Sequence, residues 1–170
     1  MGIICCDDFG MCDSVNKGTI QVLSSGRIHH VEIIGISPHS DTAISYCLDH
    51  PDIKVGCHVT LYDEFNIGFK FFIGADKPEQ EKKAQLDYLK DRGLHVWRIT
   101  SHMFKTNSDR DIKNCTWESF YIDHKFKRQY YDFTVENFPD KEIVIHCADE
   151  SMKHITHLWE SYIADVNYFK

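Results

Sequence analysis

Five short apolar runs, separated by helix-like stretches, constrain the fold of this chain more than any other feature. Each run is apolar at consecutive positions and rich in β-branched residues, which is typical of parallel strands with both faces covered. Strands that alternate with helices in this way indicate an α/β fold with a parallel sheet. With 170 residues, of which 42% are hydrophobic, we expect one core and a single domain over residues 1–170. The runs are Ile3–Cys6, Val31–Ile36, Val55–Leu61, Val96–Ile99 and Ile143–Cys147.

The stretches between these runs carry helix signals of different strength. Pro78–Arg92 is the clearest, because Pro and acidic residues open it and a Gly follows its end. The ligand sites of parallel α/β sheets lie outside the carboxyl ends of the strands, so the residues just past those ends are the ones to examine. The other expected helices are Ser14–Ser25, Pro38–Asp49, Phe126–Phe138 and Ser151–Ile163, and the expected long loops are Tyr62–Lys77 and Lys105–Lys113.

The composition argues against several kinds of partner. The formal net charge of −7 disfavours a nucleic-acid partner, because such binding needs clustered Lys and Arg to neutralise phosphates. No stretch approaches the roughly 18 apolar residues of a membrane-spanning helix, and the start of the chain lacks the regions of a signal peptide. We therefore expect a cytoplasmic protein without a membrane partner. The seven cysteines are expected to be reduced, since an odd number does not indicate a disulfide scaffold.

Chemically active side chains gather at the carboxyl ends of the expected strands. Asp7 and Asp8 follow the first strand, His58 lies in the third, His102 follows the fourth and His146 lies in the fifth. Two His and one carboxylate commonly hold a catalytic divalent metal and leave positions open for water and substrate. A second carboxylate can then act as a general base. Each residue alone has an ordinary structural explanation, such as helix capping by an aspartate, but their common placement favours a site.

The segment IICCDDFGMCDSVNKGTI, residues 3–20, resembles the opening of the YdjC-like carbohydrate deacetylases. In that family an apolar strand runs into a DDFG turn and then into the start of a helix. Further along, GCHVTLYDE resembles the family's GLHLTL segment, and EKKAQLDYLKDRG followed by RITSHM resembles its helix and THLDSHM strand. EIVIHCADES resembles the late strand that ends in an HPG turn. The resemblance therefore runs in order over nearly the whole chain.

This resemblance implies a (β/α)-barrel-like hydrolase that removes acetyl groups from N-acetylated amino sugars or chitooligosaccharides. It implies that Asp8, His58 and His102 hold a divalent metal ion, for which Mg or Zn would both serve. Asp7 would be the general base, and His146 would protonate the leaving amine or orient the substrate. The expected partner is therefore a small carbohydrate substrate.

Two departures from the family bear on this reading. Arg98 and Thr100 replace the His and Asp of the THLDSH strand, and loss of that Asp removes a residue that could orient a ligand. The chain is also far shorter than the roughly 250 residues of a complete barrel. We therefore expect a shortened or incomplete (β/α) barrel-like fold with parallel strands, whose open edge a second copy of the chain could cover in a homo-oligomer.

Two other functions stay open at this point. The first keeps the metal site but changes the substrate to another amide or ester. The second is a degenerate family member that binds metal or sugar without turnover. The shortened chain and the changes at Arg98 and Thr100 favour it, and the retention of both Asp7 and Asp8 opposes it.

Overall fold

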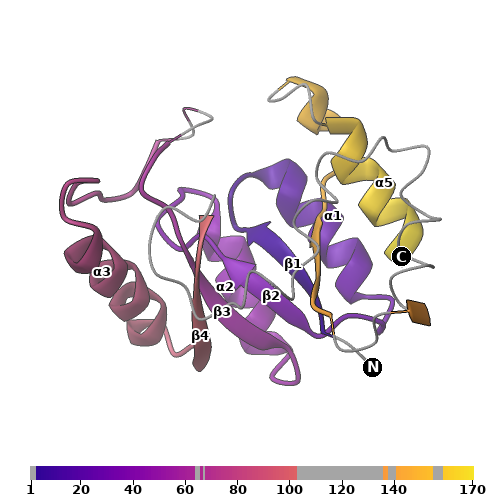
Figure 1. The fold of residues 1–170 in the computed structure, drawn as a ribbon, viewed down its shortest axis with the longest axis horizontal. Coiled ribbons are helices and arrows are strands. Elements are labelled where there is room, and N and C mark those ends of the chain that lie inside the picture. Colours follow the sequence, from indigo (N-terminus) through magenta and orange to yellow (C-terminus); the bar gives the residue numbers. More distant parts are fainter. Residues whose placement is uncertain (1–2, 64–65, 67, 103–135, 138–140, 155–158) are drawn as a thin grey trace.

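The computed structural model describes residues 3–63, 66, 68–102, 136–137, 141–154 and 159–170. Its centre is a parallel sheet with the strand order β4-β3-β2-β1-β5 (Figure 1). The first four strands are neighbours in chain order. The fifth strand pairs with the first, as the last and first strands do in a closed barrel, while the fourth and fifth strands form the two edges of this sheet. The expected α/β class is confirmed, and the open sheet is consistent with a shortened barrel-like fold. The strands are β1 (Ile4–Phe9), β2 (His30–Ile33), β3 (Lys54–Val59), β4 (Val96–Ser101) and β5 (Ile143–His146).

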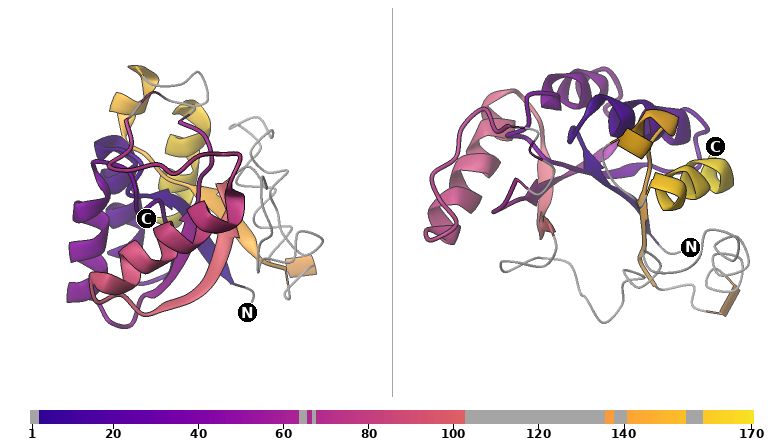
Figure 2. Two further views of the ribbon diagram at one scale, coloured as in Figure 1. Left: turned by 90° about the vertical axis from the view of Figure 1, so that its left-hand side faces the viewer. Right: turned by 90° about the horizontal axis from the view of Figure 1, so that it is seen from above.

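The described α-helices of ten residues or more lie on one side of the curved sheet (Figure 2). They follow the strands in the order expected of successive βα units. The elements are α1 (Asp13–Leu23), α2 (Ser40–Asp49), α3 (Pro78–Asp91), the 3₁₀ helix η4 (Glu150–His154) and α5 (Trp159–Phe169).

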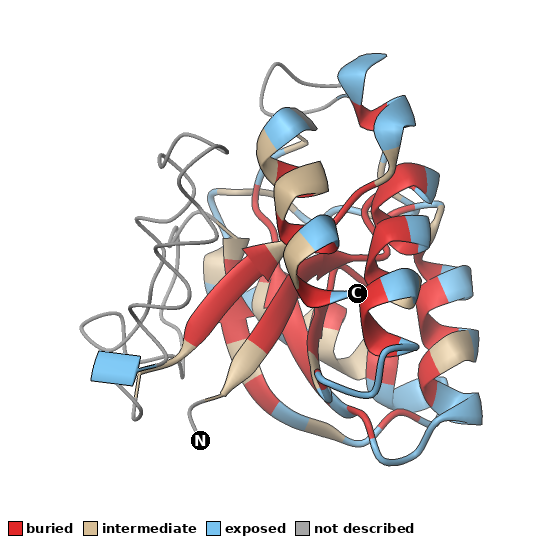
Figure 3. Cartoon of the chain, turned by 90° about the vertical axis from the view of Figure 1, so that its right-hand side faces the viewer, coloured by how far each residue is buried: buried red, intermediate tan, exposed pale blue. Residues whose placement is uncertain are grey.

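The sheet therefore has two different faces, because successive side chains of a strand point to opposite sides. The helix face packs against the helices and forms the apolar core. Figure 3 shows the buried residues of the strands and helices in red. The buried strand residues of the helix face are Cys6, Phe9, Val31, Ile33, Val55, Cys57, Val59, Ile143 and Ile145. The opposite side, here called the inner face, carries the alternate residues Cys5, Asp7, Glu32, Gly56, His58, Arg98, Thr100 and His146.

The strand boundaries differ from the sequence prediction in one way that matters. The prediction places Asp7 and Asp8 after the first strand, but β1 continues to Phe9 and contains both. They belong to the ladder because Asp7 pairs with His146 of β5. The second and third strands end earlier than predicted, at Ile33 and Val59.

The C-terminal helix prediction was also inaccurate. Instead of one helix over Ser151–Ile163, the structure has η4 followed by α5, which ends at Phe169. Helix α5 continues because Val166 and Phe169 are buried in the core. The helix predicted over Phe126–Phe138 lies outside the described residues except at positions 136–137, as does the whole predicted loop from 105 to 113.

The described cysteines are buried and are not joined to one another by disulfides, in agreement with the expectation of reduced thiols. Burial raises the pKa of the Cys47 thiol to about 12, so this thiol stays protonated near neutral pH. No helix in the described parts of the chain is long and apolar enough to cross a membrane. The described cysteines are Cys5, Cys6, Cys12, Cys47, Cys57 and Cys147.

Candidate metal centre

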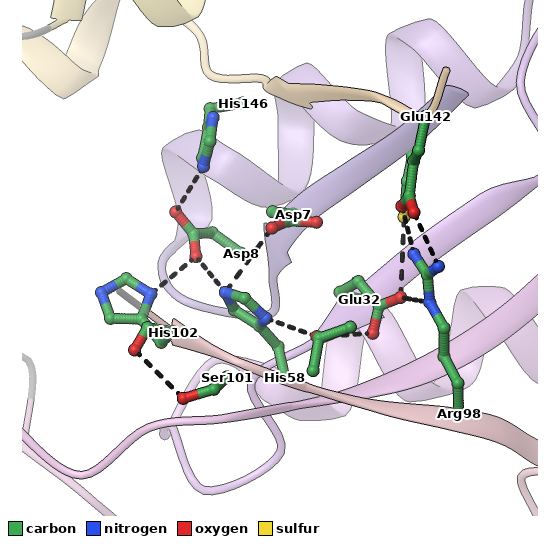
Figure 4. A network of polar contacts seen from close by, with 11 residues as sticks. Asp7, Asp8, Glu32, His58, Arg98, Ser101, His102, Glu142 and His146 are labelled. Atoms are coloured by element: carbon green, nitrogen blue, oxygen red, sulfur yellow. Dashed lines mark hydrogen bonds and ion pairs between the residues drawn. The ribbon is translucent and has the colours of Figure 1, made fainter. Parts of the chain in front are cut away.

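The five residues predicted from the sequence come together at the carboxyl edge of the sheet (Figure 4). Asp8 lies at the centre of the cluster. Its Oδ1 is 3.1 Å from His102 Nδ1 and 3.4 Å from His58 Nε2, and its Oδ2 is 3.9 Å from His146 Nε2. Asp7 completes the cluster, with its Oδ2 3.8 Å from the same His58 nitrogen. Strands that are separated in sequence by more than a hundred residues therefore contribute to one site.

Three of these residues have the geometry of a metal-binding set. One ligand atom each from Asp8, His58 and His102 lies within 4.8 Å of the others. Two atoms bonded to the same ion at about 2.1 Å, with angles of about 90–110°, lie roughly 3.0–3.4 Å apart. The two distances from Asp8 Oδ1 to the histidine nitrogens, 3.1 and 3.4 Å, fall in this range. A carboxylate and two imidazoles also form a suitable set of donors for a divalent cation.

The backbone of Asp8 explains why two adjacent aspartates can serve one site. Consecutive strand residues normally point to opposite faces, but Asp8 has a φ of 64°, in the left-handed region. The pairing of β1 with β2 shifts here, since the three steps from Cys6 to Phe9 lie opposite the two steps from Val31 to Ile33. Such irregularities re-aim side chains beside active sites. A non-glycine residue in this conformation costs on the order of 1–3 kcal/mol, which the surrounding structure must offset.

The turn that follows β1 is fixed by glycine and asparagine. Gly10 has a φ of 90° and donates its backbone N–H to Asn16 Oδ1 at 2.8 Å. Asn16 in turn donates from Nδ2 to the carbonyl of His39, at 3.0 Å. This double contact ties the DDFG turn to the start of α1 and to the segment before α2, and so holds Asp8 in place.

A second close contact positions His146. A Cβ added at Gly18 of α1 would lie 2.4 Å from the backbone nitrogen of Ala148, so only glycine lets the helix approach this segment so closely. Ser14 Oγ donates to the carbonyl of Asp149 at 3.0 Å, and Asp165 Oδ2 accepts the backbone N–H of His146 at 2.9 Å. These contacts fix the end of β5 against α1 and α5.

The buried Asp8 carboxylate is held in its charged form. Burial by itself raises its pKa, but the positive charge of His102 and hydrogen bonds from His102 and His58 outweigh it, so that the pKa lies well below the ordinary aspartate value. Tyr162 behaves in the opposite way. Burial, the charge of Asp8 and a hydrogen bond to Asp8 raise the pKa of the Tyr162 hydroxyl well above its usual value. Tyr162 therefore remains a neutral hydrogen-bond donor to Asp8.

Four residues around the site were not assigned a role by the sequence prediction. Tyr162 and Asp165 lie on the buried side of α5, and no motif marks them. Glu32 is fully buried on β2, and a charged residue inside the apolar run 31–36 was a usable signal. Thr100 was noted as a departure from the family, and its Oγ1 lies 2.7 Å from His58 Nδ1.

The fold and the site together define a barrel-like α/β protein with a strand-end site suited to a divalent cation. The chain belongs to the YdjC-like protein family, whose sequence pattern matches residues 3–107. The family predicted from the DDFG segment is thereby confirmed.

Two known proteins are similar to this chain. A carbohydrate deacetylase from Geobacillus stearothermophilus is 26% identical over 117 residues, which cover 59% of this chain and 48% of that protein. The chain therefore spans about half the length of this relative. A solved structure from Enterococcus faecalis V583, described as a candidate cellobiose-phosphate cleavage protein, superimposes with a TM-score of 0.69. The match covers 98% of this chain and 89% of that one at 19% identity, so it shows the fold alone.

Proposed function

We propose that this chain is a single-domain, metal-dependent hydrolase that removes acetyl groups from N-acetylated amino sugars or chitooligosaccharides. Asp8, His58 and His102 hold the cation, Asp7 is the general base and His146 is the general acid. The observation that carries the proposal is the convergence of Asp8, His58 and His102 beside a second buried carboxylate, in a chain of the YdjC-like family. The carbohydrate deacetylase name of the similar protein supports the choice of substrate.

The donor set favours zinc over magnesium. Two of the three protein ligands are imidazoles, which suit zinc, whereas magnesium prefers oxygen ligands and keeps several waters. A bound cation of this kind supplies Lewis acidity toward the acetyl carbonyl and makes water a stronger acid.

The residues of the chain would perform the proton transfers. The oxygen of a water attacks the carbonyl carbon of the acetamide, and the buried Asp7 carboxylate takes the proton that the water gives up. The C–N bond then breaks, and the amine leaves with a proton from His146. Asp7 and His146 are paired across β1 and β5, so base and acid come from neighbouring strands at the same edge.

The proposal separates the two adjacent aspartates by experiment. Asp7→Asn keeps the shape and removes the base, so turnover should fall by about 10²–10⁴-fold while the bound metal is retained. Asp8→Asn removes a charged ligand, so metal content should fall and excess metal should partly restore activity. The measurements are elemental analysis after loading with zinc or magnesium, and acetate release from a panel of N-acetylated sugars.

The matched control is Asp52→Asn. Asp52 is exposed and lies beside His29, before β3 and away from the site, so this variant should keep both metal and activity. Near-parental turnover of Asp7→Asn at saturating metal would contradict its role as base and make His146 the next candidate. Release of acetate from simple acetate esters or non-sugar acetamides, but from no sugar, would replace the substrate class and keep the site.

A further inference from the structure

Below the candidate metal centre, the inner face carries a buried network of polar side chains centred on Glu32. This carboxylate lies on the middle strand β2 and is fully buried. Arg98 Nε donates to its Oε1 at 2.5 Å, and Thr100 Oγ1 donates to its Oε2 at 2.9 Å. Arg98 also pairs with Glu142, donating from its Nη1 at 3.0 Å. Figure 4 shows this network beside the metal-site residues.

The space for the Glu32 carboxylate comes from a glycine on the neighbouring strand. A Cβ added at Gly56 would lie 1.9 Å from Glu32 Oε2, a distance that non-bonded atoms do not reach. Gly56 lies opposite Glu32 in the register of β2 and β3, and opposite Arg98 in the register of β3 and β4. The side chain of Glu32 therefore reaches across β3 toward β4, where Thr100 and Arg98 lie.

The hydrogen bonds in this network have a fixed direction. A carboxylate can only accept, so Thr100 uses its single hydroxyl proton to donate to Glu32. The Thr100 oxygen is then an acceptor for its other partner, His58 Nδ1, at 2.7 Å. The Nδ1 atom of His58 must therefore carry a proton. Metal binding through a neutral imidazole requires one nitrogen without a proton. That nitrogen is Nε2, which faces Asp8 and would give up the proton it shares with this carboxylate in the metal-free structure when the cation binds.

We propose that Glu32 is a positioning residue of the metal centre, acting through Thr100 to hold His58 with Nδ1 protonated and Nε2 turned toward the cation. This inference rests on the proposed metal binding. The YdjC-like strand that β4 resembles has an Asp at the position of Thr100, so the threonine departure is not a loss. The carboxylate instead comes from β2, and a hydroxyl connects it to the ligand. Arg98 holds that carboxylate in place.

A purely structural role for the network makes a different prediction, and Thr100 separates the two. Thr100→Val keeps the shape and leaves the Glu32–Arg98 pair intact, but it breaks the connection to His58. We expect its zinc affinity to fall by about 10–100-fold, the usual cost of losing the outer partner of a ligand. Thr100→Ser keeps the hydroxyl and should bind zinc like the parental chain. The probe is zinc alone, titrated into the full chain by calorimetry with a competing chelator.

The matched control is Thr19→Val. Thr19 is also fully buried, on α1, but its hydroxyl has no hydrogen-bond partner in the structure as described. This variant loses the same hydroxyl oxygen without breaking a network, so its zinc affinity should equal that of the parental chain.

A second measurement does not depend on affinity: the Nδ1–H proton of His58 should give a slowly exchanging NMR signal in the parental and Thr100→Ser chains. That signal should exchange rapidly in Thr100→Val.

The outcomes distinguish this inference from the proposed function. A parental chain that binds no divalent cation overturns the proposed function and the inference with it. The inference alone is overturned if the parental chain binds zinc normally while Thr100→Val shows undiminished binding and an unchanged His58 signal.

Glu32→Gln gives a third test, because an amide nitrogen facing Thr100 would reverse the hydrogen bond between residue 32 and Thr100 and, with it, the one between Thr100 and His58. It should weaken zinc binding by at least as much as Thr100→Val.

Discussion

The two faces of the sheet differ in almost every respect, although the same five strands build both. The helix face consists of apolar residues such as Val31, Ile33 and Cys57, which pack against the helices. On the inner face, Glu32 follows Val31 along β2 and His58 follows Cys57 along β3. This face carries buried ion pairs and the candidate metal centre. Alternation along a strand therefore separates stability from chemistry. If this separation holds, each face can be damaged without the other.

The largest effect on folding should come from the helix face. Ile33→Ala removes a fully buried side chain from the core, which typically costs about 2–5 kcal/mol of unfolding free energy. Metal affinity of the folded fraction should stay close to parental, because Ile33 points away from the site. Denaturant unfolding and zinc titration measure the two quantities. A large loss of zinc affinity at temperatures where the variant is folded would show that the faces are coupled.

The reverse damage should come from the ligands. His58→Ala and His102→Ala should each lose most of the bound metal. The metal affinity should fall by at least the roughly 10–100-fold that loss of a ligand's outer hydrogen-bond partner costs. The metal-free variants should unfold much like the metal-free parental chain, since both residues lie at the site rather than in the helix-face core. If both variants retained stoichiometric metal by elemental analysis, the ligand assignment would be wrong.

Gly56→Ala, on the inner face, should lower both the stability of the fold and the zinc affinity. The added methyl group would overlap Glu32 Oε2, and overpacking of this kind costs about 1–3 kcal/mol. Displacing the carboxylate should also break its contact with Thr100 and weaken zinc binding. Gly26→Ala is a useful contrast, because nothing lies within 4 Å of a Cβ there, although its φ of 70° adds local strain. It should reduce stability slightly and leave zinc affinity unchanged.

The smallest expected effect is the contribution of Asp8 to stability at low pH. Its pKa in the folded, metal-free protein lies well below the ordinary value, which is about 3.9 in an unfolded chain. The carboxylate therefore contributes stability above that value, and this is lost as the pH falls through the folded-state pKa. The unfolding free energy by which the parental chain exceeds Asp8→Asn at pH 5 should shrink below about pH 4. If this difference were already lost between pH 7 and pH 5, the lowered pKa of Asp8 would be contradicted.

Part of this arrangement was predictable from local sequence. The five strands were found because β-branched apolar runs are distinctive, and the DDFG segment identified the family. His58, His102 and His146 were singled out because parallel strands end at one edge of a sheet. Their roles as ligands or acid stay predictions, although the structure brings them within reach of Asp8. The boundaries of β1 and the path of the C-terminal helix were missed, because pairing and burial decide them.

The sequence by itself therefore determined which residues form strands, which side chains stand at their carboxyl ends and which family they indicate. These properties depend on neighbours along the chain, which a pattern of residues records directly. The tertiary structure alone decided that Asp8 adopts a positive φ and faces the same site as Asp7. It also decided that Glu32 reaches Thr100 over Gly56. The physical reason is that a buried carboxylate takes its role from its hydrogen-bond partners, and these come from strands that only the folded sheet brings together.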